Sequence, residues 1–128
     1  MSDQSSPATP APALPSPSDR MTRVLSTITA QARRTNLTRT ADLVVALDEA
    51  ADRGLDPAGW AAAERTAHQL AGSAGTFGFA GVSEIARSLE RFCAESGAAG
   101  GSDPVRLADA RVLLGRANDQ LTEEGQPG

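Results

Sequence analysis

Apolar residues recur along most of the chain at the spacing of amphipathic helices. Ala, Leu, Arg and Glu dominate residues 18–124, and no segment there shows the alternation or the density of β-branched and aromatic residues typical of strands. We therefore predict an all-α domain over 18–125, followed by a short tail, 126–128. Residues 1–17 hold five of the eight prolines and almost nothing apolar, so a disordered, proline-rich lead is expected there.

Capping residues, prolines and glycines divide the predicted domain into five helices. Ser18-Asp19 can cap the first, and two Asp-Pro pairs start later helices, because Asp is a good N-cap and Pro fits the first helical position. Thr35-Asn36 separates the first two helices. The predicted helices are about 19–34, 37–53, 57–76, 80–96 and 104–124, with the glycine-rich stretch 97–102 as a flexible loop.

Each predicted helix has an apolar stripe. The short loops favour antiparallel neighbours, so the expected fold is an antiparallel up-and-down four-helix bundle with an additional N-terminal helix. In chain order the stripes are Met21, Val24, Leu25 and Ile28; Leu43, Val44, Leu47, Ala50 and Ala51; Trp60, Ala63, Ala67, Leu70, Ala71, Ala74 and Phe77; Val82, Ile85, Ala86, Leu89, Phe92 and Cys93; and Leu107, Ala110, Leu114, Ala117 and Leu121.

The composition excludes most kinds of chemistry. One Cys and one His are too few for an internal disulfide or for a zinc site of the usual kinds. A net charge of −4, without a basic stripe or stacking aromatics, argues against nucleic-acid binding. No apolar run approaches the length of a membrane span, and the N-terminus does not resemble a signal peptide. We expect a cytoplasmic monomer that contacts neither nucleic acid nor membrane.

The single histidine, His68, lies on the outer strip of the third predicted helix. On a helical wheel it falls roughly 120° from the centre of the core face and shares its sector with Ala61, Arg65 and Gly72. Gly72 and Gly75 each disfavour a helix by about 1 kcal/mol relative to Ala, so another factor must favour them. Close approach of a partner to the imidazole explains Gly72 best, whereas packing against the next helix explains Gly75 at least as well.

The residues around His68 resemble the motif of histidine-containing phosphotransfer (HPt) domains of bacterial multistep phosphorelays. Here the motif reads His68-Gln-Leu-Ala-Gly72-Ser-Ala-Gly75, and Leu89-Glu90 follows on the next predicted helix. The resemblance implies that His68 accepts a phosphoryl group from a phospho-Asp receiver domain or a hybrid histidine kinase and passes it to another receiver. It also implies a stoichiometric carrier rather than an enzyme, with no cofactor of its own and with Mg²⁺ on the partner receiver.

One position departs from the family pattern. Three residues after the histidine the family commonly has Lys or Arg, and this chain has Ala71. Arg65, one turn before His68, is a candidate for the missing cation, and Gln69 can donate a hydrogen bond. Glu64 is a candidate to orient the ring, although pairing with Arg65 or solvation is an equally good interpretation. The candidate contacts with phosphate or partner are Ala61, Glu64, Arg65, Gln69, Ala71, Gly72 and Gly75.

Two residues of the fourth predicted helix also bear on the chemistry. Glu90 either hydrogen-bonds at the phosphorylation site or pairs with Arg87, three residues before it. Cys93 lies on the apolar stripe, so we expect it to act as a small hydrophobic residue and not as a nucleophile.

Other function classes stay open at this point. A helical bundle in which His68 is incidental can sequester a receiver or a kinase without phosphotransfer, and Ala71 favours that alternative. A structural assembly subunit leaves the glycines beside an exposed histidine unexplained. A metal-dependent or hydrolytic enzyme lacks ligands and triad partners.

Overall fold

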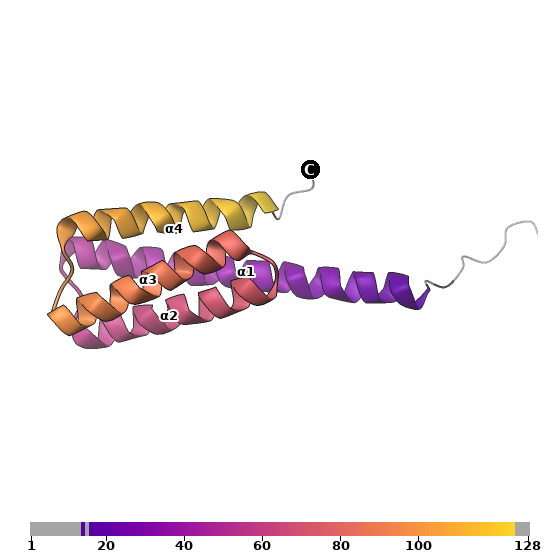
Figure 1. Ribbon diagram of the computed structural model, residues 1–128, viewed down its shortest axis with the longest axis horizontal. Helices are drawn as coiled ribbons and strands as arrows, with labels where there is room; N and C mark the ends of the chain where they lie inside the picture. Colours follow the sequence, from indigo (N-terminus) through magenta and orange to yellow (C-terminus); the bar gives the residue numbers. More distant parts are fainter. Residues whose placement is uncertain (1–13, 15, 125–128) are drawn as a thin grey trace, which may run out of the picture.

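The computed structural model describes residue 14 and residues 16–124, which form four α-helices and no strand (Figure 1). Each helix packs against the next in the chain and α4 packs against α1, as an up-and-down bundle requires. The prediction of an all-α bundle is confirmed. In chain order the helices are α1 (Pro17–Asp52), α2 (Pro57–Thr76), α3 (Ala80–Ala99) and α4 (Pro104–Glu124).

The predicted stop and start signals lie at the end of α1, at both ends of α2 and at the start of α3. The Asp56 side chain accepts a hydrogen bond of 2.7 Å from the backbone N–H of Gly59, with Pro57 at the first helical position. Gly54 and Gly78 follow α1 and α2 with φ of 82° and 87°, a left-handed conformation that suits glycine. The helix that carries His68 therefore has well-defined ends.

The additional N-terminal helix was predicted wrongly, because α1 is one continuous helix of 36 residues. Thr35-Asn36 does not break it. Asn36 is fully buried; its amide donates to the Ser73 hydroxyl of α2 (3.1 Å) and its side-chain oxygen accepts from Arg39 (2.8 Å). A buried polar residue that finds partners across a helix interface does not compete with its own backbone. The helix also starts earlier than predicted, with Ser16 as its cap and Pro17 at N1.

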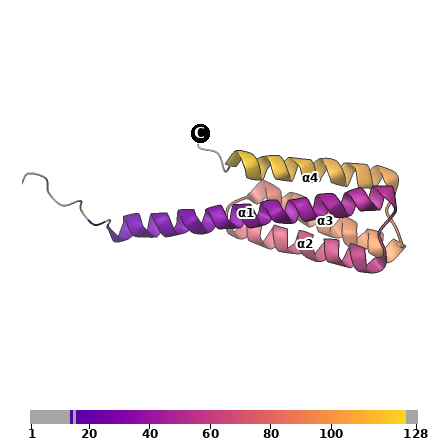
Figure 2. The ribbon, with the colours of Figure 1, turned by 180° about the vertical axis from the view of Figure 1, so that it is seen from behind.

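The N-terminal part of α1 projects past the ends of the other three helices (Figures 1 and 2). Ala32 is the first buried residue of α1. Before it only the α2–α3 connection comes close, where Phe77 lines a hollow with Ile28 and Phe79 lines another with Leu25. The apolar stripe that the sequence predicts for this segment is consequently exposed. Its relative exposures are 59% for Met21, 51% for Val24, 55% for Leu25 and 40% for Ile28.

The C-terminal end of α3 also differs from the prediction. The helix continues through Gly97 to Ala99, and Gly100 ends it in the left-handed region with φ of 80°. A Cβ at Gly97 would lie 3.2 Å from the Cβ of Trp60, so this glycine lets α3 pack closely against α2. The glycine-rich stretch that was predicted as a loop from residue 97 is therefore helical in its first part.

The core consists of the remaining predicted stripes, with exceptions at their edges. Trp60 and Phe92 meet edge to face, with ring centroids 5.7 Å apart, at one end of the α2–α3 contact. Val44 and Ala51 were predicted to face the core but are exposed, and Phe77 is half-buried beside the α2–α3 turn. The buried apolar cluster is Leu43, Leu47, Trp60, Ala63, Ala67, Leu70, Ala71, Ala74, Phe79, Val82, Ala86, Leu89, Phe92, Cys93, Leu107, Ala110, Leu114, Ala117 and Leu121.

Candidate functional site

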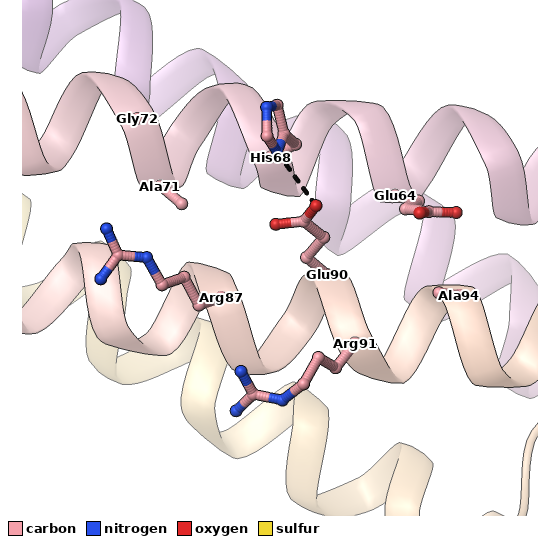
Figure 3. Close-up of a pocket in the computed structure, with 8 residues that line it drawn as sticks. All are labelled: Glu64, His68, Ala71, Gly72, Arg87, Glu90, Arg91 and Ala94. Atoms are coloured by element: carbon pink, nitrogen blue, oxygen red, sulfur yellow. Dashed lines mark hydrogen bonds and ion pairs between the residues drawn. The ribbon is translucent and has the colours of Figure 1, made fainter.

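His68 projects from α2 over the groove between α2 and α3 (Figure 3). Its side chain is 74% exposed, which matches the outer strip that the helical wheel predicts. Ala67 and Leu70 on the same helix are fully buried, so the backbone that carries the imidazole is anchored in the core. The ring is accessible to solvent while its Cα is held rigidly.

Glu90 of α3 holds the imidazole in one orientation. Its Oε2 lies 2.9 Å from Nδ1 of His68, and the carboxylate is only 29% exposed. A carboxylate is an acceptor, so Nδ1 carries the proton in this hydrogen bond. The neutral ring then has its lone pair on Nε2, and the outer ring nitrogen points away from Glu90 in Figure 3.

The carboxylate that orients the ring thus belongs to Glu90 on α3, and not to Glu64 on α2 as the sequence suggested. Glu64 lines the groove one turn before His68, yet it makes no hydrogen bond to the imidazole. The sequence named Glu90 only as one of two alternatives, a site residue or a partner of Arg87. No ion pair joins Glu90 to Arg87 among the described residues. Only the packing of α3 on α2 shows which carboxylate reaches the ring.

Positive charge lies on both sides of the imidazole. Arg65 and Gln69 line a second hollow beside His68, together with Ala61, and all three residues are exposed. Across the groove, Arg87 extends from α3 toward Ala71, whereas the Arg91 side chain points away from the ring (Figure 3).

Arg87 lines the groove with His68, and the sequence did not identify it as a candidate. Its signal was the position one turn before Glu90 on the same helix, but a helical wheel of α3 does not show which residues of α2 lie opposite. Ala71 itself is 4% exposed, so its methyl group belongs to the α2–α3 contact and offers little surface to a partner. Arg87 of α3 thus lies near the position at which the family commonly has a cation.

The two glycines near His68 have different surroundings. A Cβ added at Gly72 would meet nothing within 4 Å, so the space beside the imidazole is open. A Cβ at Gly75 would lie 3.2 Å from Oγ of Ser83, which donates a hydrogen bond of 2.8 Å to the carbonyl of Ala71. Gly75 therefore serves the packing of α3 on α2, and Gly72 serves no contact within the bundle.

Cys93 is buried in the core, as its place on the apolar stripe predicts. Burial, together with the negative charge of Glu64, raises the pKa of its thiol to about 12. The thiol stays protonated at neutral pH and is a poor nucleophile. The exposed imidazole of His68, and not this buried thiol, is thus the candidate nucleophile.

Three comparisons bear on this site. A family model described as Hpt domain matches residues 25–124, which include α2, α3, α4 and most of α1. No curated protein and no solved structure matches the chain significantly. None of the described helices is long and apolar enough to cross a membrane.

Replacement of Gly72 by Ala is expected to raise the free energy of unfolding by about 0.5–1 kcal/mol, because Ala favours the helix and the added methyl group meets no neighbour. Gly75→Ala is the matched control: its methyl group presses on Ser83, so the gain should be smaller or reversed. Urea unfolding followed by circular dichroism measures both. A G72A protein that is less stable than the wild type would show that Gly72 has a packing role.

Proposed function

Because the chain belongs to the Hpt domain family, whose members carry phosphoryl groups in phosphorelays and interact with receiver domains, we propose that it is a phosphorelay intermediate with His68 as the phosphoacceptor. In this proposal a phospho-Asp receiver, or the receiver of a hybrid histidine kinase, donates the group, and a second receiver takes it. The chain acts stoichiometrically and returns to its starting state after each transfer. A cytoplasmic location remains a prediction of the sequence.

One observation carries the proposal: an exposed imidazole whose inner nitrogen is held by a carboxylate. The 2.9 Å contact between Nδ1 and Glu90 leaves the Nε2 lone pair directed outward, where a phosphoryl group can be approached in line. An incidental surface histidine does not need a partly buried carboxylate from the facing helix to fix its ring.

The transfer step follows from this geometry. The Nε2 lone pair attacks phosphorus, a P–N bond forms, and the P–O bond to the donor aspartate breaks with its electron pair left on the aspartate carboxylate. The ring keeps its proton on Nδ1 and becomes positively charged. The Glu90 carboxylate lies against that proton and stabilises the charge as it develops. Transfer to the second receiver is the same step in reverse.

The remaining catalytic groups belong to the receiver. A receiver with Mg²⁺ at its aspartate neutralises the charge on the phosphoryl oxygens, so this chain has to supply position and access. The rigid α2 backbone supplies the position. Gly72 and Ala61 supply access, because neither has a side chain long enough to block the approach to His68.

The second candidate function is sequestration of a receiver or kinase without phosphotransfer. The observation that favours it is Ala71, whose buried methyl group stands where the family commonly has a cation. The guanidinium groups of Arg65 and Arg87 on either side of His68 favour transfer instead, since each can approach a phosphoryl oxygen.

The central test uses a receiver domain phosphorylated with a radiolabelled small-molecule phosphodonor. Wild-type protein should acquire an acid-labile, alkali-stable label, and His68→Ala should acquire none. The side chain is exposed, so this variant should fold as the wild type does, which circular dichroism checks. Label that persists in H68A would refute the assignment of the acceptor. Tight receiver binding without any label on the wild type would support sequestration.

Glu90→Ala should slow the transfer by about tenfold or more, because an orienting hydrogen bond to a charged group is lost. Glu90→Gln keeps an acceptor oxygen without the negative charge and should recover part of the rate. The chain has one histidine, so its ¹⁵N spectrum reports a single ring. We expect the Nδ1–H tautomer in the wild type and a mixture in E90A. An unchanged tautomer in E90A would contradict the positioning role.

Arg65→Ala and Arg87→Ala should each slow transfer by about tenfold, the loss expected for one charge-assisted contact to a phosphoryl oxygen. Arg91→Ala is the matched control, because Arg91 is on the same helix as Arg87 but points away from the ring (Figure 3). Single-turnover transfer rates measure all three. An unchanged rate in R65A or R87A would remove that residue from the site.

A further inference from the structure

The part of α1 that projects past the bundle, residues 17–31, has an apolar stripe that no other helix covers, although Phe77 lines a hollow beside Ile28 (Figures 1 and 2). Met21, Val24, Leu25 and Ile28 lie on one side of it and are each 40–59% exposed. A single helix of about this length is marginal in water unless its apolar side packs against something. The stripe also continues the face that α1 buries in its own bundle, where Ala32 and Leu43 follow.

We propose that this projecting segment pairs with the same segment of a second copy of the chain, in antiparallel orientation, to form a two-fold symmetric dimer. A two-fold interface must be complementary to itself. The four apolar positions meet that requirement, because they are symmetric about the midpoint between Val24 and Leu25. An antiparallel pair places Met21 opposite Ile28, and Val24 opposite Leu25, on both sides of the axis.

The charges of the chain favour this arrangement over a parallel one. The arginines of the projecting segment and its base, Arg20, Arg23, Arg33 and Arg34, lie about 90° or more from the centre of the stripe, so they do not meet across the interface. Residues 36–124 contain eight arginines and fourteen acidic residues. A parallel pair would hold two negatively charged bundles side by side. An antiparallel pair holds them at opposite ends and brings each arginine-rich segment toward the acidic bundle of the other copy.

The length of the segment fits the same register. With Val24 opposite Leu25, Pro17 of one copy lies level with Ala32 of the other, which is where the bundle begins. The two helices thus overlap along the whole projecting segment, and each end of the overlap reaches Phe77, which is half-buried and shares a hollow with Ile28. The α2–α3 groove with His68 stays open in both copies. The dimer departs from the monomer expected from the sequence.

The first test is the concentration dependence of mass by sedimentation, from about 1 μM to about 1 mM, since an interface of one helix pair is small. Wild-type protein should approach twice its 13.1 kDa mass. Leu25→Glu should stay monomeric over that range, because its dimer dissociation constant should be at least about tenfold higher. Val45→Glu is the matched control: Val45 is 65% exposed on the same helix but outside the projecting segment, so this variant should still dimerise.

The second test fixes the orientation by disulfide formation. A mixture of Met21→Cys and Ile28→Cys proteins should yield a mixed disulfide dimer under mild oxidation, and either variant alone should yield far less. Cys93 does not interfere, because it is buried in the core. Efficient disulfides within each variant alone would show a parallel pair and overturn the proposed orientation.

These experiments also distinguish the dimer from other partners that could cover the stripe. A wild type that stays monomeric at the highest concentration overturns the proposal. If, in addition, L25E binds a receiver more weakly than V45E does, the stripe is a receiver contact. Sedimentation of the wild type but not of L25E with anionic lipid vesicles would show a membrane-surface helix. Phosphoryl labelling of His68 is measured in the wild type, L25E and V45E as well. A failure of the dimer can therefore be distinguished from a failure of phosphotransfer.

Discussion

Small side chains line the contact between α2 and α3, and they let the two helix backbones approach closely enough for a glutamate to reach the imidazole. Ala67, Ala71 and Ala86 are buried between the helices, and at Gly75 even a methyl group would press on Ser83. Larger residues at these positions would move α3 outward and carry Glu90 away from His68. The spacing of the two helices therefore sets the hydrogen bond, the ring orientation and the open Nε2 together.

In the proposed transfer this chain supplies a single reactive side chain. The thiol of Cys93 is protonated and buried in the core, so the imidazole of His68 is the nucleophile that remains for that transfer. Folding holds the imidazole in place, and in the proposed transfer the charges that stabilise the transition state come largely from the partner receiver. A scaffold of this kind gains from rigidity around His68 and from empty space beside it, which is what the buried face of α2 and Gly72 provide.

The two halves of α1 show that an apolar pattern within a helix does not predict whether its stripe is buried. Both halves have apolar stripes, and the pattern by itself does not distinguish a stripe that is buried from one that is exposed. One half buries Leu43 and Leu47 with the polar Asn36 and Thr40, and the other half leaves every stripe residue exposed. The difference is not local: it depends on how far α2, α3 and α4 extend beside α1. The break predicted at Thr35-Asn36 failed for a related reason, since Asn36 finds Ser73, 37 residues away in sequence, as its partner.

From the sequence alone it follows that the domain is helical, that α2, α3 and α4 begin where Asp-Pro pairs or glycines place them, and that His68 faces outward. These features depend on helical periodicity and on caps, which act over a few residues. Tertiary structure decided that Glu90 and not Glu64 holds the ring, that Arg87 faces Ala71, that Gly75 serves packing while Gly72 leaves space, and that the start of α1 is unpaired. Each of these depends on which residues of different helices meet, and a pattern within one helix does not contain that information.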